Sequence, residues 1–169
     1  PHMIVDAHSH WWPAGISEDR KPFIAKWMCA MAGVYGLKKS PDQVLDFIAP
    51  FFGDQADEAI VARMESTGID AAVVCFVDNP NHGLDDETLM RAIETIGAFG
   101  RRHPNKIIPF AGLNPTRNNA PDRLRRAFEY HGIRGLKWHS DVGYFWPNGP
   151  EAYRMLAVLQ ELGLPLLAH

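Results

Sequence analysis

The chain carries the sequence MIVDAHSH at positions 3–10, a short apolar run that ends in two histidines. An apolar run of this kind predicts a buried β-strand. Residues two apart in a strand point to the same face with Cα atoms about 6.6 Å apart, so the imidazoles of His8 and His10 can converge on one ion. Imidazole suits zinc and other late first-row metals, and the stretch therefore predicts a metal site. The simpler alternative is a polar strand end with two exposed histidines.

The second half of the chain repeats one pattern, in which an amphipathic segment ends in glycine and an apolar run follows. Gly68, Gly132 and Gly163 occupy this position. Glycine just beyond a helix is the usual left-handed cap, and a short connection then leads into the next strand. Four further strands are predicted at residues 71–77, 107–113, 135–139 and 166–169. Strands that alternate with helices predict a parallel α/β sheet with crossover helices.

Apolar residues at helical spacing line one face of each intervening segment, and we interpret these stripes as core packing. They are Ile60, Val61 and Met64; Leu89, Ile93, Ile96 and Phe99; Leu124, Ala127 and Phe128; and Met155, Leu156, Leu159 and Leu162. An aromatic-rich insertion at roughly residues 11–54 interrupts the repeat after the first strand. It is interpreted as a lid or pocket wall, with a small subdomain or an oligomer contact as the alternatives. Within it, Ser40-Pro41-Asp42 predicts the start of a helix.

Composition and charge narrow the class of protein. The 169 residues carry a net charge of −3 and are 46% hydrophobic, which is ordinary for a domain with one core. No basic excess points to nucleic acid, no apolar run approaches the roughly 20 residues of a membrane span, and the N-terminus lacks a signal-peptide pattern. Cys29 and Cys75 form no CxxC motif, which favours a reducing, cytoplasmic location, and Cys75 is expected to be a core thiol. Residues 1–3 are interpreted as a cloning remnant and the start methionine, so His2 is excluded from the site.

Polar side chains gather where the predicted strands end, which is the edge at which parallel α/β folds bind their ligands. His8 and His10 end the first strand, Lys137 and His139 the fourth, and His169 the fifth. This recurrence favours a functional site at the strand ends more strongly than any single histidine does. His82, His103 and His131 are left out of the site.

Lys137 and His139 are two residues apart and therefore share a face. A lysine that points into a core is costly unless it is paired or modified. Lys137 therefore meets a buried carboxylate such as that of Asp6, binds a substrate carboxylate, or bridges two metals after carbamylation. Aromatic residues in the insertion and after the fourth strand favour a flat or ring-bearing substrate. The candidate substrate-binding residues are Lys137, His139, Trp11, Arg117 and Tyr144.

Residues 4–10, IVDAHSH, resemble the first-strand signature of the amidohydrolase superfamily of metal-dependent hydrolases. The stretches GIRGLKWH at 132–139 and GLPLLAH at 163–169 resemble the branch that contains aminocarboxymuconate-semialdehyde decarboxylase and related hydrolases. The resemblance implies an eight-stranded (β/α) TIM barrel, of which residues 3–169 form one partial domain with about the first five strands, interrupted by the insertion. It also implies a divalent metal, zinc, held by His8, His10 and His169.

The resemblance implies an enzyme in which a metal-activated water attacks an ester, lactone or amide of a small carboxylated or aromatic substrate. Metal-dependent, non-oxidative decarboxylation is the alternative reaction, since both reactions use the same metal ligands. The family's sixth-strand histidine and eighth-strand aspartate have no counterpart in the chain, so no catalytic residue is assigned. We therefore expect the N-terminal portion of a larger hydrolase or lyase, and we assign no activity to the chain alone.

A truncated, non-catalytic half-barrel is the alternative outside the enzymes. Five parallel strands leave two open edges, which favour pairing with another chain, so self-association as a homo-oligomer is expected in that case. A barrel nuclease of the TatD type also begins with an HxH motif, but the near-neutral charge of the chain disfavours it. The expected partner is a small-molecule substrate, with neither nucleic acid nor a membrane.

Overall fold

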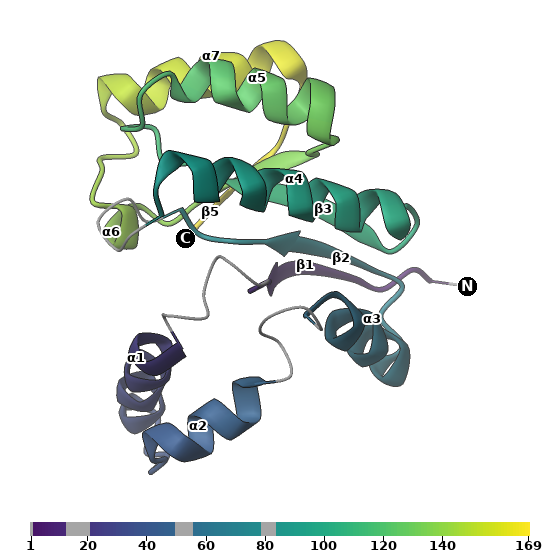
Figure 1. The fold of residues 1–169 in the computed structure, drawn as a ribbon, viewed down its shortest axis with the longest axis vertical. Coiled ribbons are helices and arrows are strands. Elements are labelled where there is room, and N and C mark those ends of the chain that lie inside the picture. Colours follow the sequence, from purple (N-terminus) through teal and green to yellow (C-terminus); the bar gives the residue numbers. More distant parts are fainter. Residues whose placement is uncertain (1, 13–20, 50–55, 79–83) are drawn as a thin grey trace. The chain divides into compact units, whose positions relative to one another are not determined.

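The computed structural model describes residues 2–12, 21–49, 56–78 and 84–169 (Figure 1). The chain divides into two compact units, one built from residues 1–10 and 64–169 and the other from residues 11–63. His82 and parts of the predicted insertion lie outside the described residues. The assignment of residues 3–169 to a single domain stays a prediction.

The first unit is built on a parallel sheet of five strands in the order β1-β2-β3-β4-β5. The strands are β1 (Val5–His10), β2 (Ala71–Cys75), β3 (Ile107–Gly112), β4 (Gly135–Trp138) and β5 (Leu166–Ala168). Each strand pairs in parallel with the next one along the chain, which confirms the predicted α/β class. A strand order that follows the chain order, with helices between the strands, is the arrangement of a (β/α) barrel, and the chain forms a five-stranded part of one.

Helices connect the strands along the chain. They are α1 (Lys21–Val34), α2 (Pro41–Ile48), α3 (Ala56–Thr67), α4 (Asp86–Arg102), α5 (Ala120–His131), α6 (Ser140–Gly143) and α7 (Pro150–Leu162). Helices α4, α5 and α7 lie on the same side of the strands (Figure 1). The predicted stripe of Leu89, Ile93, Ile96 and Phe99 is fully buried on α4, which confirms its place in the core. None of the described helices is long and apolar enough to cross a membrane.

Left-handed glycines end three helices and turn the chain back toward the sheet. Gly68, Gly132 and Gly163 have φ angles of 71°, 74° and 64° and stand just after α3, α5 and α7. Side chains with a Cβ rarely adopt this conformation, so glycine lets the helix stop and the next strand begin within a few residues. The glycine rule of the sequence is therefore confirmed at all three positions.

The second unit contains the helices α1 and α2, and α2 begins where the sequence predicts. The hydroxyl of Ser40 accepts a hydrogen bond from the backbone N–H of Gln43 at 3.2 Å, and the Gln43 side chain accepts one from the backbone N–H of Ser40 at 3.0 Å. This reciprocal capping box, with Pro41 in the first turn, satisfies donors that the helix itself leaves open. Ala25 of α1 and Val44 of α2 form a small buried cluster within the unit.

Gly112, the last residue of β3, lies directly against the chain that follows β2. A Cβ atom at this position would lie 2.4 Å from the carbonyl oxygen of Phe76 and 2.7 Å from the backbone nitrogen of Asp78. Backbone atoms cannot rotate away as a flexible side chain can, so only glycine permits this close approach. The approach fixes the position of Asp78 beside the end of β3.

Gly112→Ala is expected to lower the free energy of unfolding by about 1–3 kcal/mol, because the added methyl group overpacks against backbone atoms. Gly33→Ala on α1 is the matched control, since no atom beyond the adjacent residues and backbone of its own helix lies within 4 Å of its Cβ position. That control is expected to leave stability unchanged or to raise it, because alanine favours a helix over glycine. Urea denaturation of both variants measures the difference, and a Gly112→Ala protein as stable as the parent would contradict the close approach.

Candidate metal centre

The parallel register decides which side chains share the inner face of the sheet, the face opposite α4, α5 and α7. His10 is paired with Cys75, Cys75 with Phe110, and Phe110 with Gly135. Paired residues of neighbouring parallel strands point to the same side of a sheet. The positions of His10, Cys75, Phe110 and Gly135 therefore lie on one face, although they come from four strands.

The same face continues across β4 and β5. Lys137 follows Gly135 by two residues and is paired with Leu167, which stands two residues before His169. Since side chains two apart along a strand point to the same side, Lys137, His139 and His169 share the face of His10. His10, Lys137, His139 and His169 are all predicted site residues.

Four imidazole rings lie close together at the carboxyl ends of β1, β4 and β5. The ring centroids of His8 and His10 are 4.8 Å apart, and those of His8 and His169 are 5.7 Å apart. The ring of His139 stacks on that of His169, with centroids 4.1 Å apart and an interplanar angle of 9°. The structure thus brings together His8, His10 and His169, which the sequence proposed as ligands, and adds His139 beside them.

An irregularity in β1 lies immediately before these histidines. Asp6 is paired with Ala72 and Ser9 with Val74, so β1 has one more residue than β2 over this interval. A carboxylate oxygen of Asp6 accepts a hydrogen bond from the backbone N–H of His8 at 2.9 Å, which satisfies a donor that the irregular ladder leaves open. Bulges of this kind re-aim side chains and recur next to functional sites.

Lys137 is buried in the same region and is the most unusual polar residue of the sheet. Lys137 is only 2% exposed, and its Nζ has no hydrogen-bond partner among the described residues. The alternative that Lys137 pairs with Asp6 is therefore wrong. Burial lowers the pKa of Lys137 below its ordinary value. A buried ammonium without a partner is costly, and an anionic group brought to it would relieve that cost.

His139 is held by a carboxylate from the next turn of chain. Its Nδ1 is hydrogen-bonded to an oxygen of Asp141 on α6. Burial lowers the pKa of His139, and the hydrogen bond and charge of Asp141 act in the opposite direction. The contact leaves the Nε2 of His139 as the ring nitrogen available for other partners.

The protonation states of these rings suit a cation. Burial, followed by the neighbouring His8 and Lys137, lowers the pKa of His10 to about 4. Burial also lowers the pKa of His8. Both rings are therefore neutral near pH 7, which is the form that donates a lone pair to a metal ion. The donor set of neighbouring neutral imidazoles fits a late first-row divalent cation.

Arg117 forms a buried ion pair at the ends of β2 and β3. Its Nη2 lies 2.7 Å from one carboxylate oxygen of Asp78, and its Nε donates to the other at 3.1 Å. It also donates to the carbonyl oxygen of Leu84 at 2.6 Å and to Asp86 at 3.1 Å. Asp78 in turn accepts the backbone N–H of Asn114 at 2.8 Å. We therefore assign Arg117 to the fold, contrary to its expected use for a substrate, and leave it out of the proposed site.

The two aromatic candidates occupy different environments. Trp11 belongs to the second unit, is fully buried, and donates its indole N–H to Asp57 at 2.7 Å. Tyr144 follows α6 in a left-handed conformation, with φ at 52°, and is 70% exposed. A role for either residue in substrate binding stays a prediction.

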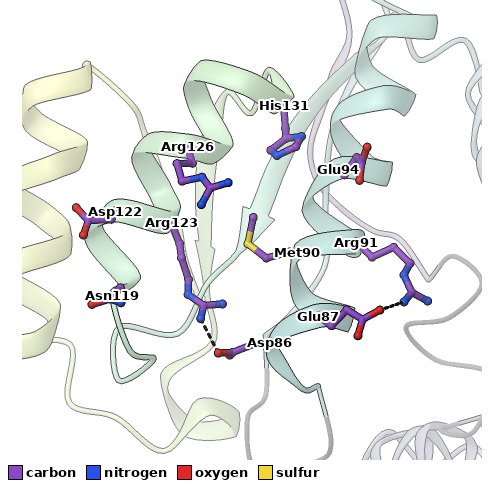
Figure 2. Close-up of a pocket in the computed structure, with 10 residues that line it drawn as sticks. All are labelled: Asp86, Glu87, Met90, Arg91, Glu94, Asn119, Asp122, Arg123, Arg126 and His131. Carbon is purple, nitrogen blue, oxygen red and sulfur yellow. Dashed lines mark hydrogen bonds and ion pairs between the residues drawn. The ribbon is translucent and has the colours of Figure 1, made fainter.

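A cavity of about 800 Å³ lies between α4 and α5, and no predicted site residue lines it (Figure 2). Its walls carry charged side chains that pair across the helices and along them. Arg123 of α5 reaches Asp86 of α4 at 2.5 Å, and Arg91 reaches Glu87 on the same helix at 2.8 Å. This cavity lies on the side of the sheet that α4 and α5 cover. It is therefore separate from the imidazole cluster, which consists of His8, His10, His139 and His169.

A family model described as Amidohydrolase matches residues 5–169 of the chain. The chain belongs to this amidohydrolase family. The match confirms the superfamily that the IVDAHSH and GLPLLAH stretches predicted. A search of curated proteins gave no match.

Solved structures share the fold of this amidohydrolase at low sequence identity. The 5-carboxyvanillate decarboxylase of Novosphingobium aromaticivorans, solved with bound manganese, is 19% identical with a TM-score of 0.73, over 99% of this chain and 51% of that one. A dihydroxybenzoic acid decarboxylase of Polaromonas, also solved with manganese, is 15% identical with a TM-score of 0.68, over 100% and 49% of the chains. The 4-oxalomesaconate hydratase of Rhodopseudomonas palustris is 22% identical with a TM-score of 0.60, over 99% and 52%. The amidohydrolase chain thus spans about half the length of these structures.

Removal of the Asp78 carboxylate is expected to destabilise the amidohydrolase strongly. The side chains of Asp78 and Arg117 are 1% and 9% exposed, so Asp78→Ala removes the buried carboxylate of the pair and leaves Arg117 with Asp86 and the Leu84 carbonyl oxygen, at a cost of about 3–5 kcal/mol. Glu87→Ala removes the exposed partner of Arg91 and is expected to cost less than about 1 kcal/mol. Equal losses in denaturant unfolding would contradict the structural role of the Asp78 pair.

The imidazole cluster is expected to make the metal-free protein less stable at mildly acidic pH. The pKa of His10 falls from 6.5 in the unfolded chain to about 4 in the folded one, so the unfolded chain binds more protons between these values. Stability therefore rises with pH through that window, and the parent loses about 2 kcal/mol on going from pH 7 to pH 5 through His10 alone. His10→Asn removes this part of the dependence. Unfolding in the presence of a chelator measures it, and an unchanged pH slope in the variant would contradict a neutral, buried His10.

Proposed function

We propose that the protein is a metal-dependent enzyme of the amidohydrolase family, in which His8, His10 and His169 hold one divalent cation. The observation that carries this proposal is the closeness of rings from the first and last strands, with 5.7 Å between the centroids of His8 and His169. Residues 161 positions apart in the sequence seldom bring imidazoles together at the carboxyl edge of a parallel sheet without a shared ligand.

The substrate class proposed is a small aromatic or conjugated carboxylic acid, and the reaction is its non-oxidative decarboxylation. Lys137 supports this choice, because its buried ammonium without a hydrogen-bond partner suits an anionic group. Two relatives of the same fold are described as decarboxylases of hydroxylated benzoic acids. When bound, the metal supplies a Lewis acid that polarises oxygen atoms of the substrate.

The chain's own residues bind the acid and move a proton in this proposal. In decarboxylation the bond from carbon to carboxylate breaks, its electron pair stays on carbon, carbon dioxide leaves, and a proton takes its place. Lys137 holds an anionic group of the substrate and fixes its orientation. His139 moves the proton at its Nε2, since Asp141 engages its Nδ1.

Hydrolysis of an ester, lactone or amide is the second candidate reaction. The family description, Amidohydrolase, favours it, and so does the pairing of His139 with Asp141, because a supported imidazole also serves as a general base. Both reactions use the same imidazoles, so the metal proposal does not depend on the choice between them.

His8→Ala and His169→Ala are each expected to weaken zinc binding by more than about tenfold, since loss of a ligand costs at least as much as loss of a group that only orients one. His131→Ala, at the end of α5, is the control and is expected to bind like the parent. Calorimetric titration of the purified chain with zinc measures all three. Parent-like zinc affinity in His8→Ala and His169→Ala would sink the ligand assignment.

The reaction is tested on the intact protein with two substrate sets. Hydroxylated benzoic acids are expected to lose carbon dioxide, and aryl esters or lactones of similar size are expected to remain largely unchanged. Lys137→Met keeps the length of the side chain and removes its charge, and it is expected to raise KM for the acids more than tenfold. Turnover of the esters alone would replace decarboxylation by hydrolysis as the proposed reaction.

A further inference from the structure

Cys75 lies beside the imidazole cluster and offers it a sulfur donor. It ends β2, is fully buried, and is paired in register with His10 on the neighbouring strand. The Sγ of Cys75 and one ring nitrogen each of His8 and His10 all lie within 4.8 Å of one another. The sequence predicted a thiol packed in the core, and the thiol is buried, but its neighbours include these two potential ligands.

We propose that Cys75 is an additional ligand of the cation at this centre, which gives a mixed nitrogen and sulfur donor set. The inference rests on the proposed metal function and goes beyond it, because neither the sequence motifs nor the family assigns a ligand to β2. His8, His10 and Cys75 supply three donors, and His169 supplies the fourth. Four donors match the number of ligands around tetrahedral zinc, and the ion would expand to five-coordinate when a substrate oxygen binds.

Two independent features of the backbone support this arrangement. The register pairs His10 directly with Cys75, so their side chains point to the same face whatever rotamers they adopt. The irregularity of β1 between Asp6 and Ser9 lies one residue before His10 and re-aims the imidazole of His8. Strand pairing therefore brings these side chains together, and side-chain rotation only has to close the remaining distance between their donor atoms.

The distances leave a small contraction to be made on binding. Donor atoms on a tetrahedral zinc ion lie about 3.5 Å apart, as follows from bonds of about 2.0 Å to nitrogen and 2.3 Å to sulfur. The donor atoms of His8, His10 and Cys75 now lie within 4.8 Å of one another, so the largest separation has to fall by about 1 Å when zinc binds. Rotation of the His8 ring about its χ angles supplies that movement, because His8 is exposed at the end of β1.

The binding step releases one proton. The S–H bond of Cys75 breaks, a bond forms between sulfur and the metal, and the proton passes to solvent. The charge of the centre rises by one when a divalent cation enters in this way, which leaves a net attraction for an anionic substrate.

A thiolate also changes which metal the centre prefers. Thiolate ligands favour zinc, whereas manganese favours carboxylates and water. Two relatives of the same fold are described with bound manganese. Cys75 therefore predicts that this protein prefers zinc over manganese and that Cys75 is the origin of the preference.

X-ray absorption spectroscopy of the zinc-loaded protein tests the proposal directly. The expected result is one sulfur scatterer at about 2.3 Å and nitrogen scatterers at about 2.0 Å. Cys75→Ser is expected to lose the sulfur shell and to weaken zinc binding by more than about tenfold, with manganese binding changed much less. Cys29→Ser is the matched control, because Cys29 is the other cysteine and lies on α1 in the second unit, and it should retain both the sulfur shell and the affinity.

The outcomes separate this proposal from the one on which it rests. Zinc bound with nitrogen and oxygen scatterers alone would overturn the Cys75 ligand and leave the imidazole site standing. Absence of stoichiometric zinc binding by the parent would overturn both. If Cys75→Ser does not fold, the sulfur shell of the parent still decides the question, because that measurement needs no variant.

Discussion

The parallel register of five strands holds side chains from positions 8 to 169 against one another at the carboxyl edge of one sheet. His10 and Cys75 at the ends of β1 and β2, and His139 and His169 just beyond β4 and β5, meet at this edge because pairing in register fixes the face and the helices between the strands fix the direction. A slip of one residue in any pair would turn that strand's contribution away from the cluster. The chemistry therefore depends on backbone pairing before it depends on any imidazole.

Two kinds of interaction keep the register from slipping. The outer face is buried under α4, whose stripe from Leu89 to Phe99 is fully covered, so a slipped strand would expose apolar surface. At the strand ends, Asp78 and Arg117 join the chain after β2 to the chain after β3 through several hydrogen bonds. Gly112 allows these two segments to approach within contact distance. The polar residues near the site thus divide into those that hold the fold and those left for a ligand.

Much of the fold follows from local signals in the sequence, and the site follows only in part. Apolar runs and the glycines at 68, 132 and 163 locate the strands, because both signals act within a few residues. The spacing of His8 and His10 likewise predicts a shared face. Cys75 was interpreted only as a core residue, since its pairing with His10 across 65 positions has no local signal. The pairing of Arg117 with Asp78 has no local signal either, because the two residues are 39 positions apart and pair only when the fold buries them together. The sequence therefore suggested a substrate-binding role for Arg117.

The central claim is that rings from β1 and from the end of β5 share one cation. Anomalous diffraction at the zinc absorption edge, from crystals of the protein grown with zinc, tests it most directly. The account predicts one strong peak within about 2.1 Å of a ring nitrogen of each of His8, His10 and His169. A peak bound elsewhere, or a map in which His169 lies away from a zinc ion held by the other two, would contradict it.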